Sequence, residues 1–208
     1  KEAQDALVLG MAHDMRTPLT GLFSYLEIIK KMEKEGKPAG EYASKAFDKA
    51  EQLRSVSDQL FEYFLVSNET NAELEEAEIA KSAFEDYLSE FCAFLECNKF
   101  KIDIEDVYWH PVKVRINTNY FGRIMNNLMS NMEKYGAKEK PVYLKINYAP
   151  DYIGLDFQNE IIKPNPYVKG TGIGLKNIEL MMKQMHGYTE VTITEDTYRI
   201  VLNFPVTN

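Results

Sequence analysis

A histidine with an acidic residue beside it stands near the start of the chain, in the segment His13–Thr20 (HDMRTPLT). An imidazole nitrogen is a nucleophile, and a carboxylate bonded to the other ring nitrogen fixes the tautomer and raises the nucleophilicity of the free one. Asp14 follows His13 directly and can reach its ring from the side. The segment therefore indicates nucleophilic chemistry at His13, although a lone exposed histidine is more often an ordinary surface residue.

A long helix over residues 2–35 would carry this histidine. Its apolar residues recur at spacings of three and four and form a stripe along one face. The stripe consists of Leu7, Met11, Met15, Leu19, Leu22, Leu26 and Ile29. His13 lies two residues from its neighbours in the stripe, roughly 200° around the helix, so its side chain should project outward. Arg16 and Thr17 lie one turn further on the same face, and Pro18 should bend the helix just past the histidine.

A second group of polar residues lies on the predicted helix Asn119–Lys134. Asn127 and Asn131 are four residues apart and Lys134 follows three residues later, so one face of the helix presents all three. An amide oxygen is a suitable ligand for Mg²⁺, and a lysine suits a phosphate. The alternative is a polar helix face that binds nothing.

A glycine-rich segment, Gly170–Gly174 (GTGIG), precedes a helix that is predicted to end near His186. Glycines let backbone amides approach a phosphate closely, and the N-terminus of a helix favours an anion. The pattern alone is weak evidence, but it adds a second element suited to phosphate binding.

The elements before residue 68 predict a helical hairpin. Gly36, Pro38 and Gly40 end the first helix, and a second helix runs from Glu41 to Ser67. An apolar seam follows its length at Ala46, Ala50, Leu53, Ser57, Leu60 and Phe64. Because one hairpin cannot cover both seams, we expect two copies to form a four-helix bundle. A hairpin packed on the rest of the same chain is the alternative.

After a polar, acidic linker over residues 68–78, the pattern changes to mixed helices and strands. Helices are predicted at Ile79–Glu96 and Asn119–Lys134, and strands at Lys99–Ile104, Val112–Ile116, Val142–Tyr148, Tyr152–Phe157, Thr189–Thr194 and Tyr198–Phe204. Several strands are adjacent in sequence. This arrangement predicts an α+β domain with a mostly antiparallel sheet over residues 79–208.

Composition excludes some classes of function. The net charge of −8 argues against nucleic acid as a partner, because duplex binding needs a basic face. Cys92 and Cys97 are five residues apart on a predicted helix and should be buried, unpaired thiols. Cysteines and histidines show no zinc-ligand spacing. No apolar run reaches the length of a membrane span and the chain starts at Lys1, so we expect the cytoplasmic portion of a protein whose membrane segment lies outside these residues.

Three segments together resemble the motifs of bacterial sensor histidine kinases of two-component systems. His13–Thr20 resembles the H-box of the dimerising phosphoacceptor domain, Asn126–Tyr135 (NNLMSNMEKY) the N-box, and Gly170–Leu175 the G2 box of the GHKL-type ATP-binding domain. Their order covers nearly the whole chain. The resemblance implies a phosphotransfer hairpin over 1–67 in a dimeric four-helix bundle, followed over 79–208 by a Bergerat-like α/β-sandwich that binds ATP.

The resemblance also implies roles for single residues. His13 would accept the γ-phosphoryl group of ATP, Asp14 would be its base, and Thr17 would orient the water that hydrolyses the phosphorylated partner. Asn131 would hold Mg²⁺. The nucleotide would bind along Asn127, Asn131, Lys134, Tyr135, Asn159, Gly170, Thr171, Gly172 and Gly174. The expected partners are a second copy of the chain and a response-regulator receiver domain, whose aspartate takes the phosphoryl group.

The chain departs from the family around the G1 box, which is Asp-x-Gly-x-Gly. We align its aspartate with Asn159, which carries no charge, and the glycines are absent. Asp156 is a rival that would shift the strand register. The lid, Ile162–Lys169, is short. These departures favour weak ATP binding, or a degenerate kinase that acts only in phosphotransfer or as a response-regulator phosphatase. A dimeric scaffold with an incidental histidine is the third alternative, against which the H-box argues.

Overall fold

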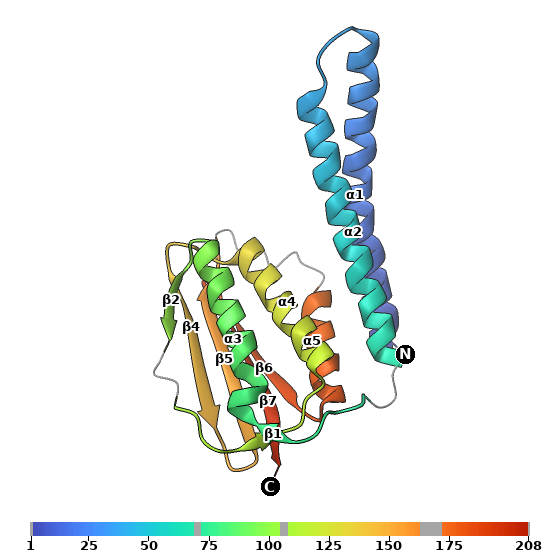
Figure 1. The fold of residues 1–208 in the computed structure, drawn as a ribbon. Coiled ribbons are helices and arrows are strands. Elements are labelled where there is room, and N and C mark those ends of the chain that lie inside the picture. Colours follow the sequence, from blue (N-terminus) through green and yellow to red (C-terminus); the bar gives the residue numbers. More distant parts are fainter. Residues whose placement is uncertain (1, 69–71, 105–107, 163–171, 208) are drawn as a thin grey trace. The chain divides into compact units, whose positions relative to one another are not determined.

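The computed structural model describes residues 2–68, 72–104, 108–162 and 172–207. Five helices and seven strands lie within these ranges (Figure 1). The chain divides into a helical hairpin, which ends at Leu65, and a second unit that starts at Val66. In the described ranges, no helix has the length and hydropathy that crossing a bilayer requires.

The hairpin consists of α1 (Glu2–Lys34) and α2 (Gly40–Asn68), as the sequence predicts. Gly36 adopts a φ of +64°, where a residue with a Cβ is strained, and the amide of Lys37 closes the end of α1 with a bond of 2.9 Å to the carbonyl of Met32. The two helices contact each other through the rings of Tyr25 and Tyr42, whose centroids are 6.3 Å apart. The predicted breakers therefore form the turn.

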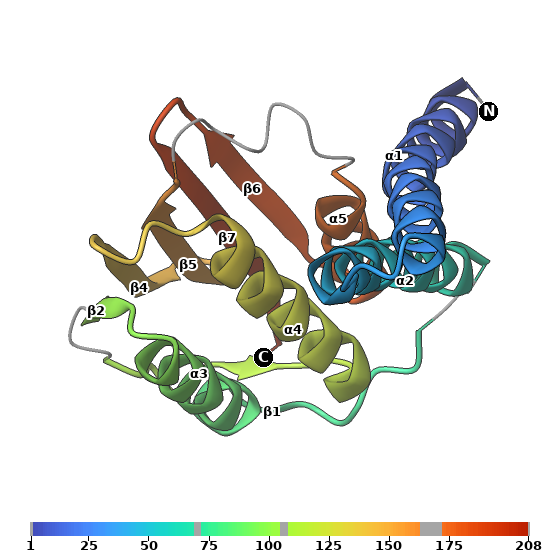
Figure 2. The same ribbon diagram turned by 90° about the horizontal axis from the view of Figure 1, so that it is seen from above.

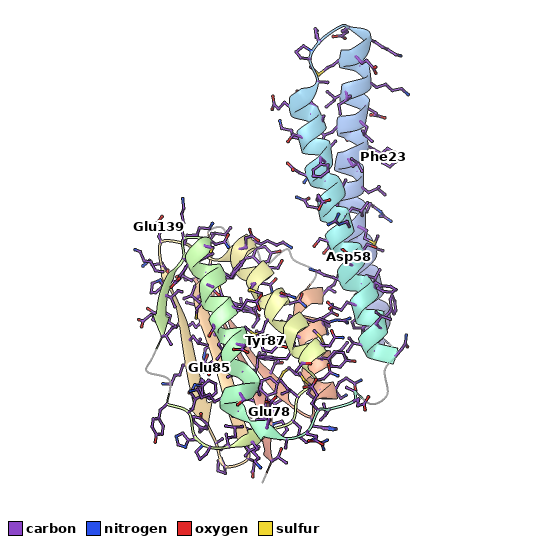
Figure 3. The ribbon with its side chains drawn as sticks, in the orientation of Figure 1. Phe23, Asp58, Glu78, Glu85, Tyr87 and Glu139 are labelled. Carbon is purple, nitrogen blue, oxygen red and sulfur yellow. The ribbon has the colours of Figure 1, made fainter. Side chains whose placement is uncertain are left out.

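One hairpin leaves much apolar surface exposed. Ala46 is buried, but Phe23 projects from α1 with 60% of its surface exposed (Figure 3). Other large apolar side chains of the hairpin that remain exposed are Leu19, Leu26, Ile28, Phe47, Phe61, Phe64 and Leu65. An apolar surface of this kind is typical of a face that a partner covers.

A single sheet forms the framework of the second unit. Its strands are β1 (Glu78–Ile79), β2 (Lys101–Ile104), β3 (Lys113–Val114), β4 (Pro141–Tyr148), β5 (Tyr152–Glu160), β6 (Tyr188–Ile193) and β7 (Thr197–Thr207). Their order is β1-β3-β7-β5-β4-β2, and β6 also pairs with β7. All paired strands are antiparallel except β2 and β4, which confirms the predicted mostly antiparallel sheet.

Three helices cover one face of this sheet (Figure 2): α3 (Ala80–Cys97), α4 (Thr118–Tyr135) and α5 (Ile173–Gln184). Aromatic rings fill the layer between the helices and the sheet. The ring centroids of Phe91 and Phe157 are 5.2 Å apart, and those of Phe84 and Phe204 are 4.9 Å apart. Such contacts contribute beyond their buried area, because the ring quadrupoles favour tilted packing. The predicted α+β architecture is confirmed.

The two cysteines differ in their surroundings. Both are free thiols, but only Cys92 is half-buried, and burial followed by the charge of Glu96 raises the pKa of its thiol. Cys97 is exposed, so the prediction that both thiols are buried is wrong for Cys97 and is met only in part by the half-buried Cys92. Cys97 is the last residue of α3, and it lies off the apolar face of that helix.

Candidate functional site

The side chains of His13 and Asp14 meet on the surface of α1. The ring Nδ1 of His13 lies 3.1 Å from the carboxylate Oδ1 of Asp14, and the histidine side chain is 75% exposed, against 25% for the aspartate. A carboxylate accepts only, so in the neutral ring this contact places the proton on Nδ1 and leaves the lone pair on Nε2. The expected outward projection of His13 and its contact with Asp14 are both present, and Nε2 is the nitrogen available as a nucleophile.

The residues after the histidine continue the polar face. The hydroxyl of Thr17 donates to the carbonyl of His13 over 3.4 Å, and Thr20 donates to the carbonyl of Arg16 over 2.8 Å. Pro18 lies inside α1 and offers no N–H to the carbonyl of Asp14 one turn earlier. Both hydroxyl oxygens can still accept a hydrogen bond from water.

The Asp14→Asn substitution tests the contribution of the carboxylate. The resemblance noted in the sequence implies that His13 accepts a phosphoryl group. If it does, the amide cannot stabilise the positive charge that develops on the ring when Nε2 attacks, and we expect the initial rate of autophosphorylation to fall about 100-fold. The rate is measured as phosphoryl incorporation from Mg-ATP. Asp48→Asn changes an exposed carboxylate elsewhere on the hairpin and serves as the control, which should retain the parent rate. A parent-like rate in Asp14→Asn would remove Asp14 from the mechanism.

The helix α4 positions the second group of polar residues. Its buried face consists of Tyr120, Phe121, Ile124, Met125, Leu128 and Met132. Asn127 and Asn131 are half-buried on one flank of this face, and Lys134 is exposed. The side-chain amide of Asn127 donates to the carbonyl of Arg123 over 3.1 Å, which leaves its Oδ1 directed away from that bond. The helix thus presents amide oxygens and an ammonium group along one flank.

The end of α4 is joined to the end of β5. The amide of Ala137 donates to the carbonyl of Glu160 over 2.8 Å, and the amide of Ile162 donates to the carbonyl of Tyr135 over 2.9 Å. A β-bridge pairs Gly136 with Ile161. These bonds bring the last turn of α4, with Lys134 and Tyr135, next to the strand end that carries Asn159.

Gly136 is required by this close approach. A Cβ at this position would lie 2.6 Å from the carbonyl oxygen of Met132 and 2.8 Å from a ring carbon of Phe100. We expect Gly136→Ala to lower the free energy of unfolding by about 1–3 kcal/mol, because the backbone must shift. Urea unfolding followed through Trp109, the single tryptophan, measures the change. Gly40→Ala, where a Cβ meets nothing within 4 Å, is the control and should not destabilise.

The strand β5 places Asn159 and Asp156 on opposite faces of the sheet. Asn159 is 3% exposed and shares the helix-covered face with Leu155 and Phe157, and its Nδ2 donates to the carbonyl of Glu160 over 2.8 Å. Asp156 lies on the other face, where the guanidinium of Arg199 donates two bonds to it at 3.0 and 2.7 Å. The geometry therefore favours Asn159 over its rival as the residue that faces α4.

Only part of the glycine-rich segment lies in the described residues. Gly170 and Thr171 lie outside them, as does most of the short lid. Gly172 has a φ of +66°, which a residue with a side chain rarely adopts, and α5 begins at Ile173, so Gly174 lies in its first turn. The N-terminal amides of α5 follow this turn and form the kind of site that suits a phosphate.

The sequence analysis did not identify two buried polar residues near this site. Asn177 lies on α5 and is fully buried, and Tyr198 pairs with Asn159 across β7 and β5. Burial, and next the negative charge of Glu179, raise the pKa of the Tyr198 phenol, which therefore stays protonated. The signal that could have revealed Asn177 is its place among the apolar residues that follow the glycines.

The residues on α4 and β5 suit a nucleotide with Mg²⁺ in their chemistry. In the part of the chain that the structure describes, no cluster of three histidine, cysteine or acidic side chains could hold a metal by itself. Mg²⁺ commonly keeps several waters and binds through substrate phosphates with few protein ligands. An amide oxygen from Asn131 is compatible with that mode of binding.

A phosphoacceptor-type histidine on a helical hairpin, followed by an α/β sandwich with a nucleotide-type site, defines the core of a histidine kinase. Residues 3–66 match the His Kinase A (phospho-acceptor) domain family. The sensor histidine kinase YrkQ of Bacillus subtilis (strain 168) is 34% identical over 203 residues, which are 96% of this chain and 46% of YrkQ. Sporulation kinase D of the same organism is 26% identical over 90% of this chain and 41% of its own length.

Solved structures agree in fold. The histidine kinase AdeS of Acinetobacter baumannii superposes with a TM-score of 0.66 at 18% identity, over 94% of this chain and 98% of AdeS. The histidine kinase ThkA, solved in complex with the response regulator protein TrrA, gives 0.68 at 15% identity, over 94% of this chain and 60% of ThkA. The chain belongs to the bacterial sensor histidine kinases. It spans less than half the length of the two Bacillus relatives.

Proposed function

We propose that this chain uses Mg-ATP to phosphorylate His13 and then passes the phosphoryl group to an aspartate of a response-regulator receiver domain. The observation that carries the proposal is the contact between His13 Nδ1 and Asp14 Oδ1 at 3.1 Å on an exposed histidine side chain, which in the neutral ring leaves the lone pair on Nε2. The names of the relatives support a kinase of this type.

The chemistry at His13 follows from this tautomer. The lone pair of Nε2 attacks the γ-phosphorus, a new N–P bond forms, and the bond from phosphorus to the bridging oxygen breaks with its electrons on ADP. The ring then carries a positive charge, which the carboxylate of Asp14 stabilises at Nδ1–H and removes by taking the proton. Most of the acceleration in phosphoryl transfer comes from positioning and charge neutralisation.

The nucleotide is assigned to the flank of α4, the end of β5 and the start of α5. Asn131 offers an amide oxygen to Mg²⁺, which supplies charge neutralisation on the phosphates when it is bound. Lys134 adds a positive charge, and Asn159 offers a hydrogen-bonding amide to the base. The remaining assigned residues are Asn127, Tyr135, Gly170, Thr171, Gly172 and Gly174.

A homodimer is the assembly that the hairpin supports. The exposed apolar residues of α1 and α2, among them Phe23 and Phe64, would be covered if two hairpins form a four-helix bundle. The dimer presents two copies of His13 to solvent. A receiver domain then docks on the hairpin, where the hydroxyl of Thr17 can orient the water that hydrolyses the phosphorylated partner.

Autophosphorylation with labelled ATP tests the proposal. We expect the chain to take up label from γ-labelled but not from α-labelled ATP, in the presence of Mg²⁺, and the label to be lost in acid, as an N–P bond predicts. A receiver domain added afterwards should take over the label. A folded dimer that takes up no label would contradict the kinase assignment.

A degenerate kinase is the second candidate, and Asn159 is the observation that favours it. An amide at this position brings no charge to the base of the nucleotide, and the glycines of the G1 box are missing. Such a protein would act in phosphotransfer or as a phosphatase without ATP. Calorimetry with Mg-ADP separates the two candidates, because measurable binding supports the kinase and the absence of binding supports the degenerate form.

A further inference from the structure

The connection between the hairpin and the sheet domain is tied to the start of α4. Residues 72–77, here called the strap, lie between α2 and β1 (Figure 1). The amide of Glu75 donates to the carbonyl of Ile116 over 2.9 Å, and Arg115 Nε donates back to the carbonyl of Glu75 over 3.0 Å. The side-chain amide of Asn117 donates to the carbonyl of Glu73 over 2.9 Å. The predicted linker is therefore hydrogen-bonded to residues 115–117 through Glu73 and Glu75.

The carboxylate of Glu75 completes the N-terminus of α4. The first amides of a helix have no partner within it, and a negative charge at this end is favourable. Glu75 Oε1 accepts from the amide of Thr118 at 3.1 Å and from its hydroxyl at 2.6 Å. The cap residue Asn117 accepts from the amide of Tyr120 at 2.9 Å. The side chains of Asn117 and Glu75 thus both cap α4, and Glu75 belongs to the strap.

A third element meets at the same point. Tyr87 of α3, labelled in Figure 3, donates from its hydroxyl to the carbonyl of Thr118 over 3.2 Å. Burial, and next the negative charge of Glu75, raise the pKa of Tyr87, so its hydroxyl remains a donor. The first residue of α4 is thereby bonded to the strap on one side and to α3 on the other.

The polar residues of α4 lie between two fixed ends. Glu75 bonds to the first turn, and the bonds from Ala137 to Glu160 and from Ile162 to Tyr135 hold the last turn. Asn127 and Asn131 lie between these attachments. Because a helix is stiff along its length, a small shift of the first turn on loss of the Glu75 bonds would be carried to the side-chain amides of Asn127 and Asn131.

We propose that Glu75 is a positioning residue for the nucleotide site, which it holds through α4 without touching the ligand. The inference rests on the proposed function, because it presumes that α4 binds the nucleotide. In the sequence, three residues lie between the end of α2 and the strap. The bonds of Glu75 therefore join the strap to the helix that carries Asn131.

The test compares Mg-ADP binding by calorimetry in the full chain. Glu75→Ala should raise the Kd about three- to tenfold, the size expected for the loss of one helix cap. Glu75→Gln keeps an acceptor for Thr118 and should recover part of the affinity. Glu76→Ala removes the neighbouring exposed carboxylate and is the matched control, expected to bind like the parent. Thermal unfolding by circular dichroism checks that each variant is folded.

Amide hydrogen exchange separates a role in positioning the nucleotide site from a role in stability alone. Coupling between two sites is reciprocal, so Mg-ADP should slow exchange of the strap amides in the parent, and this slowing should disappear in Glu75→Ala. Two results would overturn the role of Glu75 and leave the proposed function intact. One is a parent-like Kd for Mg-ADP in a folded Glu75→Ala variant, and the other is a hydrogen-exchange rate of the strap amides that Mg-ADP does not change in the parent. A parent chain that binds no Mg-ADP would instead overturn both.

Discussion

Replacing His13 with glutamine should leave no phosphoryl label on the protein above background. Glutamine is polar and fits an exposed helix position, but its side-chain nitrogen has no lone pair available for attack on phosphorus. The side chain of His13 is 75% exposed and contacts the carboxylate of Asp14 at the surface, so its replacement should cost little stability. Incorporation from γ-labelled ATP, followed at neutral pH where the N–P bond survives, measures the effect.

The control for this variant is nucleotide binding. His13 belongs to the hairpin and the assigned nucleotide residues belong to other elements, so the His13→Gln chain should bind Mg-ADP with the Kd of the parent. Equal binding together with lost label assigns the acceptor role to His13. Residual acid-labile label on the variant would place the acceptor at another residue, such as His110 or His186.

Replacing Asn131 with alanine should produce the second largest loss, a fall in the autophosphorylation rate of roughly 100-fold or more. The amide oxygen is the candidate ligand for Mg²⁺ from α4, and a preorganised group of this kind contributes about that factor in phosphoryl and acyl transfer. The residue is half-buried on the flank of the helix and alanine favours a helix, so the fold should persist.

Asn126→Ala is the matched control for Asn131, since it removes an exposed asparagine from the same helix. It should retain the parent rate. The Mg²⁺ dependence adds a second readout, because Asn131→Ala should need a higher Mg²⁺ concentration for half of its maximal rate. If both variants lose the same activity, the defect lies in α4 as a whole and the assignment of Mg²⁺ to Asn131 fails.

The parts of the fold with strong local patterns could be predicted from the sequence. Spacings of three and four along the first 67 residues predict two helices. The turn between them needs a glycine at position 36, because the backbone there has a positive φ. Alternation along Leu155 and Phe157 places these residues, and with them Asn159, on one face of the sheet. The contact of Asp14 with His13 was also predictable, because the two residues are neighbours in the chain.

The features that depend on contacts between distant segments could not be predicted. The acidic composition of residues 68–78 indicates a linker, but Glu75 binds Thr118, 43 residues further along the chain. Likewise, the role of Asp156 follows from Arg199 on a neighbouring strand, which neutralises its charge on the far face of the sheet. Composition reports how polar a segment is and does not report which partner will satisfy it.

Mapping the phosphorylated residue is the most direct test of the central claim. The chain is incubated with Mg-ATP, digested at neutral or mildly alkaline pH, and sequenced by tandem mass spectrometry with a method that preserves N–P bonds. The account predicts one phosphoryl group on the peptide that contains His13, and none in parallel digests of Asn131→Ala at the same time point. A phosphoryl group on any other residue, with His13 unmodified, would contradict it.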